Sequence, residues 1–408
     1  LNDPAMNKNL TSVRGIRCWG AHTGVKSMRR DLAIIHSEVP AATAAVFTRN
    51  RVVAEPVKLS RRHLRDHRAQ AIVCNAGNAN ACTGKAGAEG ARAMARATAE
   101  QLGIDERDVV VASTGLIGAP FPTEDIVDGI RENVPKLSKK AAAGTFTANA
   151  ILTTDTFAKE GFLEFEADGY EINLAGIAKG SGMIHPNMAT MLAFIVCDIA
   201  IEPRLLQRLT RECVDESFNM ITVDGDTSTN DMVVVMANGL AENPVITDRK
   251  DPGCQKFRDK LLELMVHLAK LIVSDGEGAT KFIEYRVRGA RSKKDARTIA
   301  RTISDSTLVK AAMFGRDPNW GRVLCAAGNA DVDLDPSKVD LFMGDTSRQM
   351  HVLDRGAPVD LDRNALKKLL RNSHIQIDLD LHEGRATAVA WGADLSTDYV
   401  LFNSVYTT

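Results

Sequence analysis

The stretch "KGSGMIHPNMATMLAF" at residues 179–194 places a lysine, two glycines and a proline turn directly before Thr190, where an apolar run begins. A threonine hydroxyl is a poor nucleophile unless a base lies beside it. The α-amino group of the same residue can be that base if the chain is cut just before it. Its reference pKa is about 7.7–8.0, so much of this amine is neutral near physiological pH. The segment therefore allows Thr190 to act as an N-terminal nucleophile.

The residues that precede Thr190 also suit a self-cleavage step. The glycines and Pro186 let the loop adopt an unusual backbone conformation, and the small Ala189 leaves the carbonyl of the Ala189–Thr190 bond accessible. No separate catalytic histidine is required, which fits a sequence whose nine histidines form no evident Ser/His/Asp set. Because a threonine at the start of a strand is also ordinary, these residues alone leave both interpretations open.

The elements that must position this segment are readable from the apolar patterns. Helical spacing or composition predicts helices at 84–103, 203–220, 257–275 and 361–374. Continuous apolar runs predict strands covered on both faces at 108–114, 191–199 and 231–238, whereas alternation predicts half-buried antiparallel strands at 281–289, 375–381 and 386–395. We expect sheets covered by helices in at least two lobes, one of which ends near residue 189.

Composition excludes several classes of function. The chain has 408 residues, 44% apolar and 25% charged, with a formal net charge of −1, as expected for a globular protein of two domains or lobes. No basic patch predicts nucleic-acid binding. No apolar run approaches the length of a membrane span, and no secretory signal is evident. Seven dispersed cysteines without CxxC spacing indicate reduced thiols, so we expect a cytoplasmic protein.

The segment "AKGSGMIHPNMATML" resembles the cleavage-site signature of the ornithine acetyltransferases, also called glutamate N-acetyltransferases. In that family the chain cuts itself between Ala and Thr, and the new N-terminal Thr carries the acetyl group. Further motifs in family order span most of the chain: "NAGNANACTG", "ASTGLIG", "TTDT", "DGDTSTNDM", "SDGEGATKFIE", "GRDPNWGRV" and "NSVYTT". His185 departs from the family, which often has a smaller residue there. We expect it to affect the cleavage rate without removing a reacting group.

The resemblance also implies roles for individual residues. It makes Ala189–Thr190 the cleavage site and Thr190 the nucleophile, and it assigns the oxyanion hole to Thr114 and Gly115. It implies substrate contacts from Thr153, Lys179, Glu277, Asn403 and Thr408, with Thr190 among them. Considered without the resemblance, the lysine could be solvated and the glutamate could be an ordinary turn carboxylate. The C-terminal contacts require a terminal segment that is docked rather than frayed. No metal and no cofactor are expected.

The activity implied by the resemblance is a ping-pong transfer. Thr190 takes acetyl from N2-acetylornithine, ornithine leaves, and glutamate accepts the acetyl group, by default in arginine biosynthesis. Residues 1–189 become one chain and 190–408 the other, assembled as a heterotetramer of two copies of each. The implied fold is α/β, with sheets layered between helices as in N-terminal-nucleophile enzymes. The resemblance leaves open whether acetyl-CoA is a second donor.

Two rival functions and two side motifs stay open at this point. A related N-terminal-nucleophile aminopeptidase or amidase would use water as acceptor, and a non-enzymatic ligand-binding protein would stay uncut. "DGDTSTND" (224–231) lacks the glycine and distal glutamate of an EF-hand at the right offsets, so we expect a structural role near the active site. In "GRDPNWGR", Arg316 and Arg322 could bind phosphate, or the segment could simply form a turn.

Overall fold

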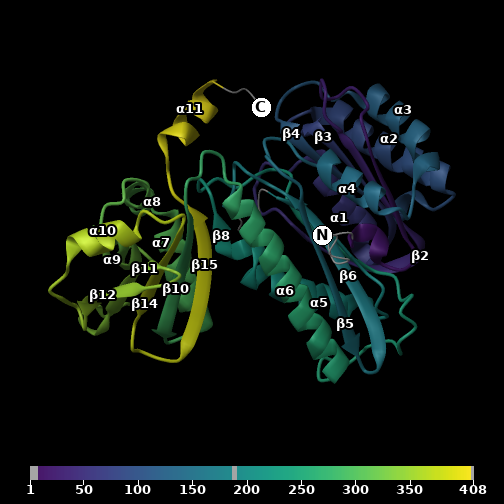
Figure 1. Cartoon of the computed structure of the whole chain (residues 1–408). Coiled ribbons are helices and arrows are strands. Elements are labelled where there is room, and N and C mark those ends of the chain that lie inside the picture. Colours follow the sequence, from purple (N-terminus) through teal and green to yellow (C-terminus); the bar gives the residue numbers. More distant parts are fainter. Residues whose placement is uncertain (1–7, 186–190, 406–408) are drawn as a thin grey trace, which may run out of the picture.

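The computed structural model describes residues 8–185 and 191–405, which form two β-sheets with helices between and around them (Figure 1). The first sheet has the order β4-β3-β2-β9-β7-β6-β5, with β1 paired to β2. Its strands are β1 (Ile16–Ala21), β2 (Leu32–Phe47), β3 (Arg68–Asn78), β4 (Val109–Leu116), β5 (Lys159–Ala167), β6 (Tyr170–Lys179), β7 (Leu192–Cys197) and β9 (Met232–Ala237).

The second sheet has the order β13-β12-β11-β14-β10-β15-β8. Its strands are β8 (Ile221–Thr222), β10 (Phe282–Ala290), β11 (Asp340–Asp345), β12 (Gln349–Asp354), β13 (Ala357–Pro358), β14 (His374–Asp380) and β15 (Ala386–Ala393). Strands β10 and β14 pair in parallel, so the expectation of antiparallel strands is wrong for this pair, although β10 and β15 are antiparallel as expected.

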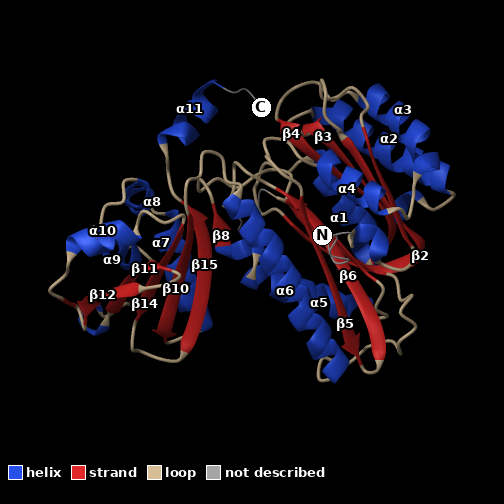
Figure 2. Ribbon diagram, viewed as in Figure 1, coloured by secondary structure: helices blue, strands red, loops and turns tan. Residues whose placement is uncertain are grey.

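Helices form layers on and between the sheets (Figure 2). Helix α6 packs on β5 and β6 of the first sheet and on β8 and β15 of the second, while α7 packs on β10 and β15. The α/β architecture of sheets between helices is thus confirmed. The helices are α1 (Glu55–His63), α2 (Gly84–Leu102), α3 (Thr123–Asn133), α4 (Ala141–Ala150), α5 (Pro203–Glu216), α6 (Pro252–Ser274), α7 (Lys293–Asp305), α8 (Thr307–Phe314), α9 (Gly321–Gly328), α10 (Arg363–Leu369) and α11 (Thr397–Val405).

The apolar runs at 191–199 and 231–238 became the central strands β7 and β9 of the first sheet, whereas the run at 108–114 became β4 at its edge. Every residue of β7 and β9 is buried, because one core lies on each face of these strands. Leu192 pairs with Lys179 on antiparallel β6 and with Met232 on parallel β9. In this register the C-terminal end of β6 lies beside the N-terminal ends of β7 and β9.

The expected boundary between lobes near residue 189 is wrong. Strands β7 and β9 follow that position in the sequence, yet they lie between β2 and β6, which precede it. Both parts of the chain therefore contribute strands to one sheet, and hydrogen-bonded ladders join them at β6–β7 and at β2–β9.

The cysteines agree with the expectation of reduced thiols. All seven cysteines are free, and most of them are buried. Burial raises the pKa of the Cys18 and Cys74 thiols to about 12, which keeps them protonated and inert.

Among the helices within residues 8–185 and 191–405, none combines the length and apolarity needed to cross a bilayer.

Candidate active site

Lys179 is the last residue of β6, and its ammonium donates hydrogen bonds to the hydroxyls of two other predicted site residues. Lys179 Nζ donates to Thr153 Oγ1 at 2.7 Å and to Thr114 Oγ1 at 3.3 Å. Lys179 is only 6% exposed, so the alternative of a solvated lysine is wrong. Side chains from β4, from the turn after α4 and from β6 therefore meet at one point.

These residues line a cavity of about 130 Å³. Of the residues that the sequence predicted for the site, those within the described ranges all line it: Thr114, Gly115, Thr153, Lys179, Glu277 and Asn403. Thr154, Ser228 and Asn230 line it as well, and the sequence analysis had not singled them out. The predicted nucleophile Thr190, its neighbour Ala189, and Thr408 lie outside the described residues.

Gly115 occupies a position that only glycine fits. Its φ is +124°, and a Cβ there would overlap the backbone of Gly77, its partner on the parallel strand β3. The close approach of two backbones therefore explains the glycine by itself. Its role in an oxyanion hole stays a prediction.

Asp155 is a buried carboxylate that the sequence analysis missed, although it is part of "TTDT". It accepts hydrogen bonds from the backbone N–H of Thr153 at 3.0 Å and of Gly180 at 2.7 Å, and it lies 3.8 Å from Lys179 Nζ. Burial alone would raise its pKa, but the charges of Lys179 and Lys159 outweigh burial and hold it at about 2. Asp155 is therefore ionised, and it fixes the backbone of Thr153, whose hydroxyl contacts Lys179, and of Gly180, which follows Lys179.

The fully buried Lys159 is a second residue of the site that the sequence analysis missed. Its ammonium lies between Asp155 at 2.7 Å and Asp275 at 2.6 Å. Asp275 follows α6 in the motif "SDGEG", and it also accepts from the N–H and the hydroxyl of Thr156. No local pattern marks Lys159, because a lysine is buried only where tertiary structure supplies its partners.

Glu277 and Asn403 also line this cavity, and they contact each other. Asn403 Nδ2, on the largely exposed helix α11, donates to Glu277 Oε2 at 3.1 Å, and this hydrogen bond connects the C-terminal helix to the cavity. The N–H of Glu277 donates to the Ser181 carbonyl at 3.1 Å. A Cβ on Gly182 would overlap the Glu277 carboxylate. The glycine-bearing loop is thus shaped to receive this side chain.

A larger cavity of about 520 Å³ adjoins the first and shares Gly115, Thr153 and Thr154 with it. Lys26 and Arg29 line this second space, so an anionic group placed there would meet positive charge. Burial lowers the pKa of Lys26 to about 8.

The two side motifs have structural contacts. The carboxylate of Asp224 in "DGDTSTND" accepts from the N–H groups of Met183 and Ile184, which agrees with the expected structural role beside the site. In "GRDPNWGR", Arg322 on α9 lies 3.7 Å from Asp317, which lies between α8 and α9.

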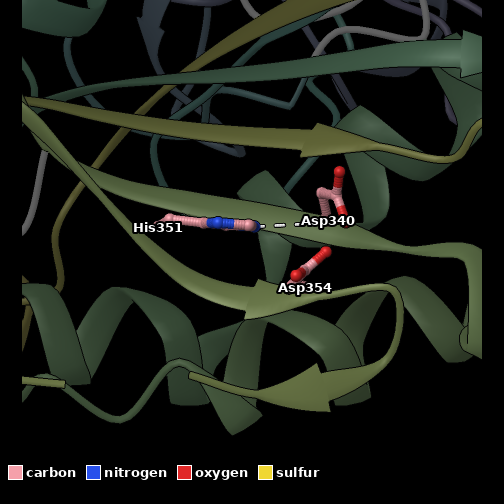
Figure 3. A group of neighbouring side chains, drawn as sticks. All are labelled: Asp340, His351 and Asp354. Atoms are coloured by element: carbon pink, nitrogen blue, oxygen red, sulfur yellow. Dashed lines mark ion pairs between the residues drawn. The ribbon is translucent and has the colours of Figure 1, made fainter. Parts of the chain in front are cut away.

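Within the described ranges, one group of side chains has the composition of a metal site. Asp340 on β11 and His351 and Asp354 on β12 bring ligand atoms within 4.8 Å of one another (Figure 3). His351 Nε2 and Asp340 Oδ1 are 4.0 Å apart, wider than the ~3.3 Å between ligand atoms of a tetrahedral zinc site. Asp340 already accepts from the Arg355 N–H and faces His382 Nε2 at 2.7 Å. The group shares no residue with the cavity beside Lys179.

Comparison with known proteins places this geometry in context. The profile of the ArgJ family matches residues 17–408. "Arginine biosynthesis bifunctional protein ArgJ" of Symbiobacterium thermophilum is 47% identical over 405 residues, 98% of each chain. The ArgJ 1 protein of Clostridium acetobutylicum is 44% identical over 401 residues, again 98% of each. A solved structure of ornithine acetyltransferase complexed with ornithine, from Mycobacterium tuberculosis, is 33% identical and covers 44% of this chain and 96% of its own, with a TM-score of 0.40.

The buried carboxylate yields a test of the network. We predict that Asp155→Asn destabilises the protein by about 2 kcal/mol at pH 7, from the shift of its pKa between the unfolded and folded states. Because the folded-state pKa is depressed, this stabilisation is present above pH ~4 and is lost as the pH falls toward 2. Urea unfolding of both proteins at pH 7 and pH 3 measures the difference.

The exposed carboxylate variant Asp128→Asn is the control, and its effect should stay small at both pH values. A difference between wild type and Asp155→Asn that is equally large at pH 7 and pH 3 would contradict the ionic account. It would indicate that the variant acts through packing alone.

Proposed function

Because the chain belongs to the ArgJ family, we propose that it is an acetyltransferase of arginine biosynthesis that moves acetyl from N2-acetylornithine to glutamate. The observation that supports this most strongly is the cavity in which Lys179, Thr153 and Thr114 meet. The strand register adds to it, since Lys179 pairs with Leu192, two residues beyond the predicted nucleophile Thr190.

The first step in the proposal is the cut before Thr190. The hydroxyl attacks the carbonyl of Ala189, and water then hydrolyses the resulting ester. This releases a carboxylate at residue 189 and an α-amine at residue 190, so that residues 1–189 and 190–408 become separate chains. The β6–β7 and β2–β9 ladders join strands from both chains, which supports a cut that leaves the fold intact.

The second step is acetyl transfer through an ester. The neutral amine of Thr190 accepts the hydroxyl proton while the oxygen attacks the acetyl carbonyl of N2-acetylornithine. Thr114 and Gly115 would stabilise the oxyanion. The α-amine of ornithine leaves with the proton, and the α-amine of glutamate attacks the ester to give N-acetylglutamate. The two half-reactions are the reverse of one another in form, so one constellation can serve both.

Charge complementarity suggests how substrates are held. The Lys179 ammonium would bind the α-carboxylate that both amino acids carry, and Thr153 would add a hydrogen bond. Glu277 would pair with the δ-ammonium of ornithine, with Asn403 holding that carboxylate in place. Lys26 and Arg29 in the adjoining cavity offer further positive charge. Thr408 is a further contact in the proposal.

The remaining parts of the proposal concern surroundings and assembly. We infer a cytoplasmic enzyme that works without metal or cofactor, assembled as a heterotetramer of two copies of each chain. The two relatives, from Symbiobacterium thermophilum and Clostridium acetobutylicum, are both named as bifunctional proteins. This supports testing acetyl-CoA as a second donor to glutamate.

The function and the lysine are tested in one assay. Purified protein receives glutamate together with either acetylornithine or acetyl-CoA, and N-acetylglutamate is measured. We predict product from acetylornithine. Loss of the charge-assisted contact in Lys179→Ala should lower kcat/KM roughly ten- to a hundredfold for acetylornithine and for glutamate.

Lys85→Ala, at the exposed start of α2, is the matched control and should behave as wild type. Acetate released without any glutamate requirement would instead favour the amidase alternative. Unchanged kcat/KM values in Lys179→Ala would remove the lysine from substrate binding.

The cleavage step yields a separate prediction. Denaturing gels of the purified protein should show two bands of similar size, one with the N-terminal sequence Thr-Met-Leu-Ala-Phe. Thr190→Ala lacks the hydroxyl and should fold, stay full-length and be inactive. Thr190→Ser keeps a hydroxyl and should be cut. A single full-length band in active enzyme, or activity in Thr190→Ala, would refute the N-terminal nucleophile.

A further inference from the structure

The backbone of residues 183–185, directly before residue 186, is hydrogen-bonded to residues that follow the proposed cut. The N–H groups of Met183 and Ile184 donate to the Asp224 carboxylate at 2.6 and 2.7 Å. The carbonyl of Ile184 accepts from the Val223 N–H at 2.6 Å. Asp224, the first residue of "DGDTSTND", and Val223 before it therefore hold the backbone next to the cleavage segment.

His185 extends this anchoring through its backbone and its side chain. Its carbonyl accepts from Thr227 Oγ1 at 3.0 Å. Arg301 Nη2, on α7, lies 2.8 Å from His185 Nε2. Because a guanidinium can only donate, Nε2 must be the unprotonated acceptor, and Nδ1 then carries the hydrogen. Nδ1 lies 3.1 Å from Thr222 Oγ1 and 3.3 Å from the Asp305 carboxylate.

Both ring nitrogens of His185 therefore contact residues of the second lobe. Arg301 and Asp305 come from α7, and Thr222 comes from β8. Thr222 Oγ1 also lies 3.2 Å from Asp305 Oδ1, so the acceptors around Nδ1 are themselves oriented. The His185 side chain is 20% exposed, because a cavity of about 790 Å³ adjoins the ring.

The chain is fixed again directly after the cleavage segment. The Met191 carbonyl accepts from the N–H of Met232 on β9 at 3.2 Å, and β7 begins at Leu192. Residues 186–190 thus connect two fixed ends. The orientation of a hydroxyl toward the carbonyl of its own preceding peptide depends on where those ends are held, and small misplacements are costly in rate.

We propose that His185 is a positioning residue for self-cleavage, which holds the entry to residues 186–190 on Arg301, Thr222 and Asp305. The inference rests on the proposed function, in that it presupposes the cut at Ala189–Thr190. For this role the side chain of residue 185 must accept a hydrogen bond from Arg301 and donate one to Asp305. Both groups must belong to residue 185 itself, so that the contacts hold the backbone of the loop. An alanine meets neither requirement.

The test follows cleavage of newly made chains. Cell-free translation with a labelled amino acid, stopped by chase, gives the time course of full-length chain on a denaturing gel. We expect His185→Ala to slow the cut roughly tenfold, because hydrogen bonds to charged groups are lost. In His185→Gln the side-chain amide supplies both an acceptor and a donor that are covalently attached to the loop, so this variant should recover much of the wild-type rate. His374→Ala, on β14, is the matched control and should cut as wild type.

Two further arms separate positioning from other roles. Free imidazole can enter the adjoining cavity but cannot tether the loop, so it should not restore cleavage in His185→Ala. The double variant His185→Ala/Arg301→Ala should be no slower than the slower single variant, because both act through one contact. Thermal melting of His185→Ala, compared with wild type, checks that the variant is folded.

The outcomes distinguish this inference from the proposed function. If the wild-type chain stays full-length, self-cleavage itself is wrong. If wild type is cut and His185→Ala is cut equally fast, the positioning role is wrong while the proposed function stands. Rescue by imidazole, or a glutamine variant as slow as the alanine variant, would also overturn the positioning role.

Discussion

A buried ammonium between two carboxylates is the interaction on which the site depends. Lys159 lies 2.7 Å from Asp155 and 2.6 Å from Asp275, and it has no exposed surface. Removing one partner of such a group leaves an uncompensated buried charge, which is strongly destabilising. Asp155 accepts from the backbone N–H groups of Thr153 and Gly180, next to Lys179. The carbonyl of Asp275 accepts from the Ser181 hydroxyl at 2.6 Å, so the network reaches the glycine loop as well.

The same network joins parts of the molecule that self-cleavage would separate. Asp155 and Lys159 precede the proposed cut, whereas Asp275 follows it at the end of α6. The first sheet repeats this arrangement, because β7 and β9 lie between strands from the other side of the cut. Buried charge and strand ladders therefore give a physical reason why two chains would remain one enzyme. They also explain why residues from both parts line a single cavity.

Much of this could be predicted from the sequence, and the gaps have physical causes. The fully apolar runs became the buried strands β4, β7 and β9, because continuous apolarity requires cover on both faces. Alternation along 281–289 located β10 correctly but could not reveal that its neighbour β14 is parallel, since alternation reports burial and not strand direction. The predicted lobe boundary near residue 189 was wrong because a cleavage motif marks a site of chemistry and not a division between sheets.

Lys159 was missed because its burial depends on Asp275, which is distant in the sequence. Lys179, Thr153 and Thr114 carried motif signals, and the structure brings them together.

The central claim is that the acetyl group passes through an ester on Thr190. The direct measurement is to incubate the enzyme with acetylornithine in the absence of glutamate, while the released ornithine is removed. After rapid acid quench and digestion, mass spectrometry should find one acetyl group on the peptide that begins at Thr190. Glutamate added before the quench should remove the label and yield N-acetylglutamate. If the label never forms while transfer proceeds only with both substrates present together, transfer is direct in a ternary complex and the ester mechanism is wrong.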